Sequence, residues 1–231
     1  MSGGTRELPE LEPPGALQLP DTVEATLPTG LTVLVIRRPT VPLVELRLRV
    51  PFARSEVADA SVLAQTLLSG TDTMSNVQIA AELQVIGGAL SAGVDPDRLL
   101  VSGNGLVSGL DRGLAILAEV LTGASYPAGE VVTERERLAD RIQVARSQPS
   151  HLARVALLRR IYGSHPYAVQ TPEPEQVREV GSDRLQELHG ARVHPSGATL
   201  VLVGDLDPAA ALDSAATALG GWDGGGAPVE L

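Results

Sequence analysis

The chain has no cysteine and no lysine, and only 2% of its 231 residues are aromatic. Without cysteine, a disulfide scaffold, a thiolate zinc site and a cysteine nucleophile are all excluded. Because aromatic side chains are so few, the core must be built from leucine, valine, isoleucine and alanine. Hydrophobic residues make up 43% of the chain, which is enough for one large domain or two small ones.

Positive charge is also scarce, since 28 acidic residues face 18 basic ones and the net charge is −10. A nucleic-acid surface needs a basic face, whereas adjacent arginines occur here only as isolated pairs, Arg37-Arg38 and Arg159-Arg160. We therefore expect no nucleic-acid partner. No apolar run approaches the roughly 20 residues of a membrane helix, and no signal peptide pattern opens the chain, so we expect a cytoplasmic protein without a transmembrane segment.

Proline and glycine mark both ends of the chain. Residues 1–22 are rich in proline, glycine and glutamate, which predicts a flexible lead-in. Residues 220–231 are rich in glycine, which predicts a flexible tail or linker. Regular structure is predicted between them, in a single domain over residues 23–219.

Hydrophobic patterning within this domain mixes two periods. Polar and apolar residues alternate over Leu43–Val50, which predicts a strand with one buried face. Further strands are expected at 32–36, 90–92, 98–103 and 198–203. Helices are expected at 58–68, 75–86, 110–121, 129–146, 150–162, 183–189 and 208–219. This order indicates an α+β fold, a mostly antiparallel sheet with helices packed on one face.

Candidate catalytic side chains are few. The four histidines, His151, His165, His189 and His194, form no i, i+4 pair, so we expect separate surface or loop side chains rather than a metal site. In the segment His165-Pro166-Tyr167 the histidine is expected to fix a loop. Alternating acidic and basic residues over 134–141 indicate a solvated, self-paired helix face rather than an acid–base pair.

Several local patterns occur together in one order along the chain. They are Leu27–Ile36, Pro42–Val50, Gly70-Thr71, Ile79–Leu83, Ile86–Ala92, Glu134-Arg135, His165–Tyr167, His194-Pro195 and Ala198–Pro208. In this order they resemble the pitrilysin/insulinase family of zinc metallopeptidases, whose first, N-terminal domain they span almost completely. The resemblance implies the same α+β fold.

Members of that family carry an inverted zinc motif, H-x-x-E-H, on one helix and a third ligand, a glutamate, on a later helix. The resemblance places the two histidines at Ser61 and Gln65, the general base at Ala64 and the third ligand at Arg141. Neutral serine and glutamine are poor zinc ligands, alanine accepts no proton, and arginine is a permanent cation. The resemblance therefore implies a non-catalytic member that holds no zinc.

The family also binds peptide along an edge strand, where an asparagine in Gly-Gly-x-x-Asn-Ala holds the substrate backbone. The matching stretch here runs from Gly87 to Ala92, with Ser91 in place of the asparagine. Main-chain pairing needs no particular side chain, so Leu90, Ser91, Ala92 and Gly93 are the candidate peptide-binding strand. An ordinary edge strand explains the pattern equally well.

Some members of the family work as heterodimers of a zinc-bearing and a zinc-less subunit. The resemblance thus implies a non-catalytic subunit that pairs with a zinc-bearing homologue, helps to enclose peptide and leaves zinc to that partner. The chain shows no internal repeat of the domain, so it corresponds to half of such a subunit. The alternative is a structural or assembly scaffold that keeps the peptidase fold without handling peptide.

Overall fold

A computed structural model describes residues 19–53 and 55–224. Within them lie six strands: β1 (Thr22–Thr26), β2 (Thr32–Arg37), β3 (Leu43–Pro51), β4 (Ala89–Val94), β5 (Arg98–Leu106) and β6 (Thr199–Gly204). The helices are α1 (Val57–Thr66), α2 (Asn76–Val85), α3 (Leu110–Gly123), α4 (Ala128–Ala145), α5 (Pro149–Tyr162), α6 (Pro174–Arg178), α7 (Ser182–Arg192) and α8 (Pro208–Leu219). The predicted α+β class is confirmed.

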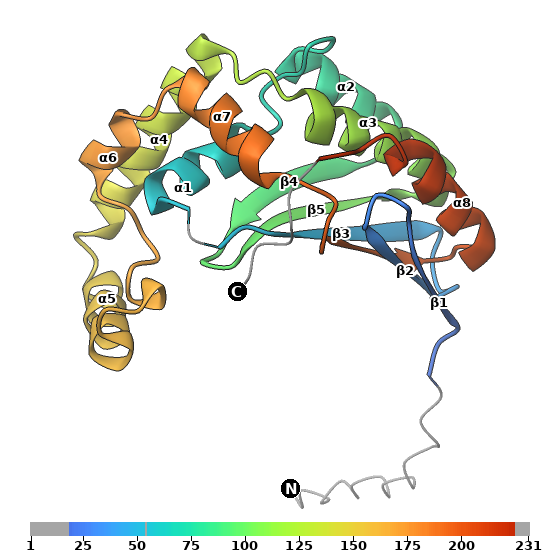
Figure 1. Cartoon of the computed structure of the whole chain (residues 1–231), viewed down its shortest axis with the longest axis horizontal. Coiled ribbons are helices and arrows are strands. Elements are labelled where there is room, and N and C mark those ends of the chain that lie inside the picture. Colours follow the sequence, from blue (N-terminus) through green and yellow to red (C-terminus); the bar gives the residue numbers. More distant parts are fainter. Residues whose placement is uncertain (1–18, 54, 225–231) are drawn as a thin grey trace, which may run out of the picture.

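The six strands form one sheet in the order β1-β2-β6-β3-β5-β4. Every neighbouring pair is antiparallel except β2 and β6, which run parallel. The late strand β6 therefore lies between two strands from the start of the chain, while β4 forms one edge (Figure 1). The sequence indicates a mostly antiparallel sheet. The single parallel pair forms because the chain after α7 enters the middle of the sheet, where β6 lies beside β2 and runs in the same direction.

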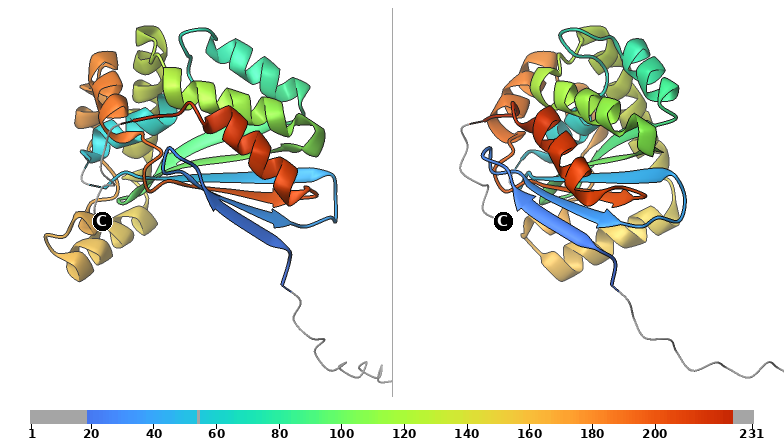
Figure 2. Two further views of the ribbon diagram at one scale, coloured as in Figure 1. Left: turned by 45° about the vertical axis from the view of Figure 1, so that its right-hand side comes forward. Right: turned by 90° about the vertical axis from the view of Figure 1, so that its right-hand side faces the viewer.

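Most helices are stacked on one face of the sheet, as predicted (Figures 1 and 2). The alternation in β3 shows why: Val44, Leu46 and Leu48 are buried beneath the helices, whereas Glu45 and Arg47 are exposed on the other face. Helix α5 stands apart from the helical layer and buries none of its side chains. No helix among the described residues is long and apolar enough to cross a membrane.

Local signals set the limits of the helices that flank the edge strand. Ser75 caps α2 through a capping box with Gln78, whose side chain accepts from the Ser75 backbone N–H. The helix then stops before Gly87, which adopts a φ of +62° that favours glycine. This turn delivers the chain directly into β4 at Ala89.

The C-terminal stretch that the glycine content assigned to a linker is packed at its beginning. Trp222 is only 1% exposed, and its indole Nε1–H donates to the carbonyl of Val193 at 3.3 Å. The ring thus covers the chain between α7 and β6. The packed domain therefore reaches Trp222, beyond the boundary at residue 219, because a single large aromatic side chain outweighs the flexible glycines around it. Of the lead-in predicted at 1–22, residues 1–18 lie outside the described residues, and of the tail predicted at 220–231, residues 225–231 do.

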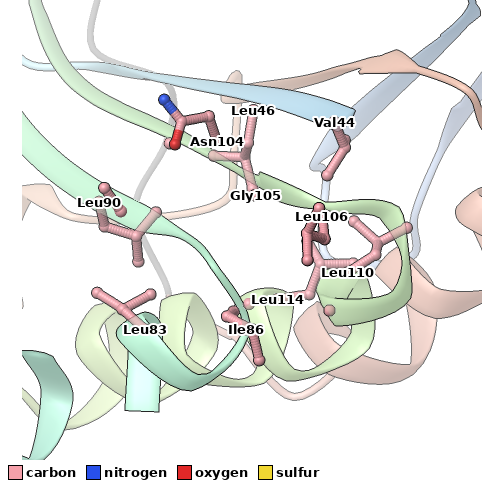
Figure 3. Close-up of a pocket in the computed structure, with 14 residues that line it drawn as sticks. Val44, Leu46, Leu83, Ile86, Leu90, Asn104, Gly105, Leu106, Leu110 and Leu114 are labelled. Carbon is pink, nitrogen blue, oxygen red and sulfur yellow. The ribbon is translucent and has the colours of Figure 1, made fainter. Parts of the chain in front are cut away.

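A small apolar cavity of ≈30 Å³ lies between β5, α2 and α3 (Figure 3). Leu46, Leu90 and Leu114 contribute to its walls, and Ile86 closes one side. Gly113, inside α3, also lines it, and a Cβ built there would meet only Ile86 Cδ1, at 3.5 Å. The site therefore has room for one methyl group.

Gly113→Ala is expected to stabilise the domain by about 1 kcal/mol, because alanine favours the helix interior and the methyl fills part of the cavity. Urea unfolding of the wild-type protein and of Gly113→Ala measures the difference in their free energies of unfolding. Gly109→Ala is the matched control, since its Cβ would lie 2.6 Å from Ile86 Cβ and should destabilise the protein by about 1–3 kcal/mol. A Gly113→Ala protein that is less stable than wild type would contradict this account of the cavity.

Candidate functional site

Helices α1 and α4 bring the candidate motif positions to one contact. Ser61 and Gln65 are four residues apart on α1 and so share one side of the helix. Arg141 of α4 reaches across, and its guanidinium donates to Gln65 Oε1 at 2.7 Å. Both Gln65 and Arg141 are exposed, so the pair is open to solvent. Residues 65 and 141, which lie 76 positions apart in the sequence, are thus in direct contact.

The other two positions carry no reactive group. The hydroxyl of Ser61 donates to the carbonyl of Val57 at 2.6 Å, one turn earlier on the same helix. Ala64 is 4% exposed and belongs to the hydrophobic core. Neither residue can take a proton from a water molecule at neutral pH.

These four residues do not fit the zinc ion that the family carries. A zinc ligand must offer a lone pair, whereas the guanidinium of Arg141 is a cation whose N–H groups already point at Gln65. Across residues 19–53 and 55–224, no group of three histidine, aspartate or glutamate side chains is placed to hold a metal ion. The contact is a polar link between two helices.

The candidate peptide-binding strand, β4, pairs with β5 on one side and forms the edge of the sheet on the other. It packs beside α1, so the edge and the α1–α4 contact are neighbours. A Cβ added at Gly93 would meet no atom within 4 Å, so the face of the strand is open at this residue. Ser91 Oγ donates to the carbonyl of Ser102 in β5 at 3.4 Å, so this side chain contacts the sheet.

His165 has the loop role that the sequence indicates. Its Nδ1 accepts from the backbone N–H of Tyr167 at 3.3 Å, and the two rings pack edge to face with centroids 4.7 Å apart. The hydroxyl of Tyr167 in turn donates to Asp97, in the turn between β4 and β5. These contacts join the loop after α5 to the end of the edge strand.

His189 differs from the expected surface or loop imidazole. It lies in α7, partly buried, with Nδ1 2.7 Å from the Tyr126 hydroxyl and Nε2 2.9 Å from the Leu121 carbonyl. A carbonyl only accepts, so Nε2 carries the proton and Nδ1 accepts from the hydroxyl. Tyr126 is itself 1% exposed, and burial raises the pKa of its hydroxyl far above the usual value. No sequence signal distinguished this histidine, because its partners lie more than 60 residues away.

Stability is expected to fall on acidification through this histidine. Burial lowers the pKa of His189 below its ordinary value of 6.5, so between those two values the unfolded chain binds a proton that the folded chain does not. The stabilisation that neutral His189 contributes is fully present above pH 6.5. As the pH falls below this value, the free energy of unfolding decreases by at most about 1.4 kcal/mol per pH unit. Urea unfolding between pH 5 and 8 measures it, and His189→Gln should flatten the slope. Equal slopes in the two proteins would contradict the assignment.

Solved structures show that this α+β fold occurs in other proteins. An M16 peptidase inactive domain from Pseudomonas fluorescens superposes with a TM-score of 0.82 at 22% identity, covering 91% of this chain and 53% of that one. A protease from Helicobacter pylori gives 0.81 at 18%, over 92% and 53%. The periplasmic protease PqqL from Escherichia coli gives 0.82 at 17%, over 94% and 26%.

The sequence places the chain within that class. The profile of the insulinase family, peptidase family M16, matches residues 60–175, and the chain belongs to this family. Curated relatives include uncharacterized zinc proteases of Mycobacterium tuberculosis and Mycobacterium bovis, each 26% identical over 190 residues. The match covers 79% of this chain and 43% of each relative, so the chain spans less than half the length of these proteins.

Proposed function

We propose that the chain is a non-catalytic subunit of a heteromeric insulinase-family metallopeptidase, which pairs with a zinc-bearing homologue and helps to enclose a peptide substrate. The observation that carries the proposal is the hydrogen bond from Arg141 to Gln65. It stands where the resemblance puts the second and third zinc ligands of active members. Zinc would then be held by the partner alone.

Two further observations support this assignment. The Pseudomonas fluorescens relative is described as an inactive domain, so domains of this fold without activity occur. The edge of β4 beside α1 leaves main-chain groups available for pairing with an extended peptide. A subunit of this kind would contribute to the complex by positioning peptide and would leave bond cleavage to its partner.

The test begins with capture of the full chain and its partners from native lysate. We expect a zinc-bearing homologue in the captured complex, with peptide cleavage that requires both chains and stops when a chelator removes the zinc. The chain alone should cleave nothing. Chelator-sensitive cleavage by the purified chain alone, or equal activity of the partner without it, would overturn the proposal.

A structural scaffold without peptide handling is the second candidate. It is favoured by Ser91, which replaces the asparagine of active members and contacts the Ser102 carbonyl inside the sheet. A scaffold would leave the partner's cleavage rate unchanged while holding the complex together. Size-exclusion chromatography checks that the complex forms, and peptidase assays of the partner with and without the chain separate this outcome from the first.

A further inference from the structure

A cleft of ≈580 Å³ separates α5 and the chain that follows it from the body of the domain. One wall is formed by α5, by the short turn Pro166–Ala168 and by the segment up to Gln176. The other is formed by α1, the end of α4 and the end of β4. Figures 1 and 2 show α5 standing apart from the helical layer at this place.

Helix α5 turns one face to the cleft. His151, Arg154, Val155 and Leu158 recur at i, i+3, i+4 and i+7, and all four line the cavity. Phe52 lies on the body side of the same cavity. The cleft thus combines apolar surface with basic side chains, which is the usual composition of a binding pocket that fixes both shape and charge.

The charges in the lining do not cancel. Three arginines and two carboxylates line the cleft: Arg146, Arg154, Arg159, Asp95 and Glu173. Arg146 forms an ion pair with Glu173, and Asp95 is held by Arg98, 2.6 Å away. Among the described residues, Arg154 and Arg159 form no ion pair, and Arg154 donates only to the Gln170 side-chain oxygen, at 2.9 Å. A locally positive cleft in a chain with a net charge of −10 is a site for anionic groups.

The cleft opens at the end of the edge strand. Val94, Asp95 and Pro96, which end β4 and begin the next turn, contribute to its lining together with Ser61 of α1. A peptide paired with β4 would therefore continue past Val94 into the cleft. The candidate peptide strand and the basic pocket thus form one continuous path.

We propose that this cleft selects acidic peptides, with Arg154 and Arg159 binding aspartate or glutamate side chains of a segment aligned on β4. The inference rests on the proposed function, because it names the substrate class that the same edge strand would take. A guanidinium matches a carboxylate with paired N–H donors, and the apolar walls would hold the neighbouring side chains. Arg154 and Arg159 are specificity determinants and take no part in bond cleavage.

Fluorescence anisotropy on the purified full chain tests the preference directly. The probes are three labelled decapeptides in which valine and threonine alternate with glutamate, with glutamine or with lysine. We expect the glutamate peptide to bind about tenfold more tightly than the glutamine peptide, and the lysine peptide to bind most weakly. Arg154→Gln combined with Arg159→Gln should abolish the difference. Arg160→Gln, on the same helix but outside the lining, should preserve it.

Charge reversal gives an independent check. Arg154→Glu with Arg159→Glu should shift the preference to the lysine peptide, and both side chains are exposed, so thermal unfolding should be unchanged. Equal binding of the three peptides to wild type, or an undiminished preference in the double glutamine variant, would overturn the cleft assignment. If that happened while the captured complex still showed chelator-sensitive cleavage, the proposed function would stand. If the chain preferred the glutamate peptide but captured no peptidase from lysate, the cleft assignment would stand and the proposed function would be overturned.

Discussion

Ser61→His, Gln65→His and Arg141→Glu together are expected to give the chain a site that binds about one zinc ion, whereas the wild-type chain is expected to take up none. The contact between Gln65 and Arg141 already brings the two helices within reach of a shared ion, and residues 61 and 65 have the i, i+4 spacing of a two-histidine site. Two neutral imidazoles and one carboxylate would then replace a hydroxyl, an amide and a cation. Metal analysis after dialysis against limiting zinc measures the change.

The double variant Ser61→His with Gln65→His is the matched control. Arg141 would still place a positive charge at the third ligand position, so zinc affinity should be lower than in the triple variant by on the order of 100-fold. The triple variant is expected not to cleave peptide, because Ala64 supplies no general base. Stoichiometric zinc in wild type, or none in a folded triple variant, would show that the motif positions are assigned wrongly.

Trp222→Ala is expected to destabilise the domain by about 3–5 kcal/mol, the usual cost of removing a large buried aromatic side chain. The ring is 1% exposed and covers the chain at Val193, so the substitution leaves a cavity and an unpaired carbonyl. Such a loss is a large fraction of the stability of an ordinary domain. Denaturant unfolding of the two proteins measures it.

Trp222→Phe separates packing from hydrogen bonding. It keeps most of the buried area and loses the indole N–H, so it should cost about 1–2 kcal/mol. A truncation after residue 219 should behave like Trp222→Ala. If all three proteins unfolded at the denaturant concentration of wild type, Trp222 would lie outside the cooperative core.

The sequence predicts most of the elements because their signals are local. The alternation over Leu43–Val50 and the capping pattern at Ser75 each act within a few residues, and the strand and the helix that they predict are confirmed. The position of β6 between β2 and β3 follows from pairing between residues that are at least 150 positions apart. Trp222 packs against Val193, which lies 29 residues earlier, and the glycines around Trp222 gave no sign of this contact in the sequence.

The candidate site could be predicted only through the resemblance. Composition and spacing give no reason to single out Gln65 or Arg141, and their contact depends on how α1 crosses α4. The basic cleft could not be predicted from the sequence either, because its lining comes from segments that are far apart in the chain. Arg159 was noted only as one of an adjacent pair, whereas its partners in the lining come from α4, β4 and the segment after α5.

The central place of β6 has a consequence for how the chain acquires its structure. Strands β2 and β3 each need β6 as a neighbour, yet β6 begins at Thr199 and is synthesised long after both of them. Until then the two early strands present unpaired, apolar edges that can associate with other chains. Folding that waits for such distant pairing is intrinsically slow and exposed to aggregation. We therefore expect nascent chains that end before Thr199 to be ribosome-bound clients of chaperones.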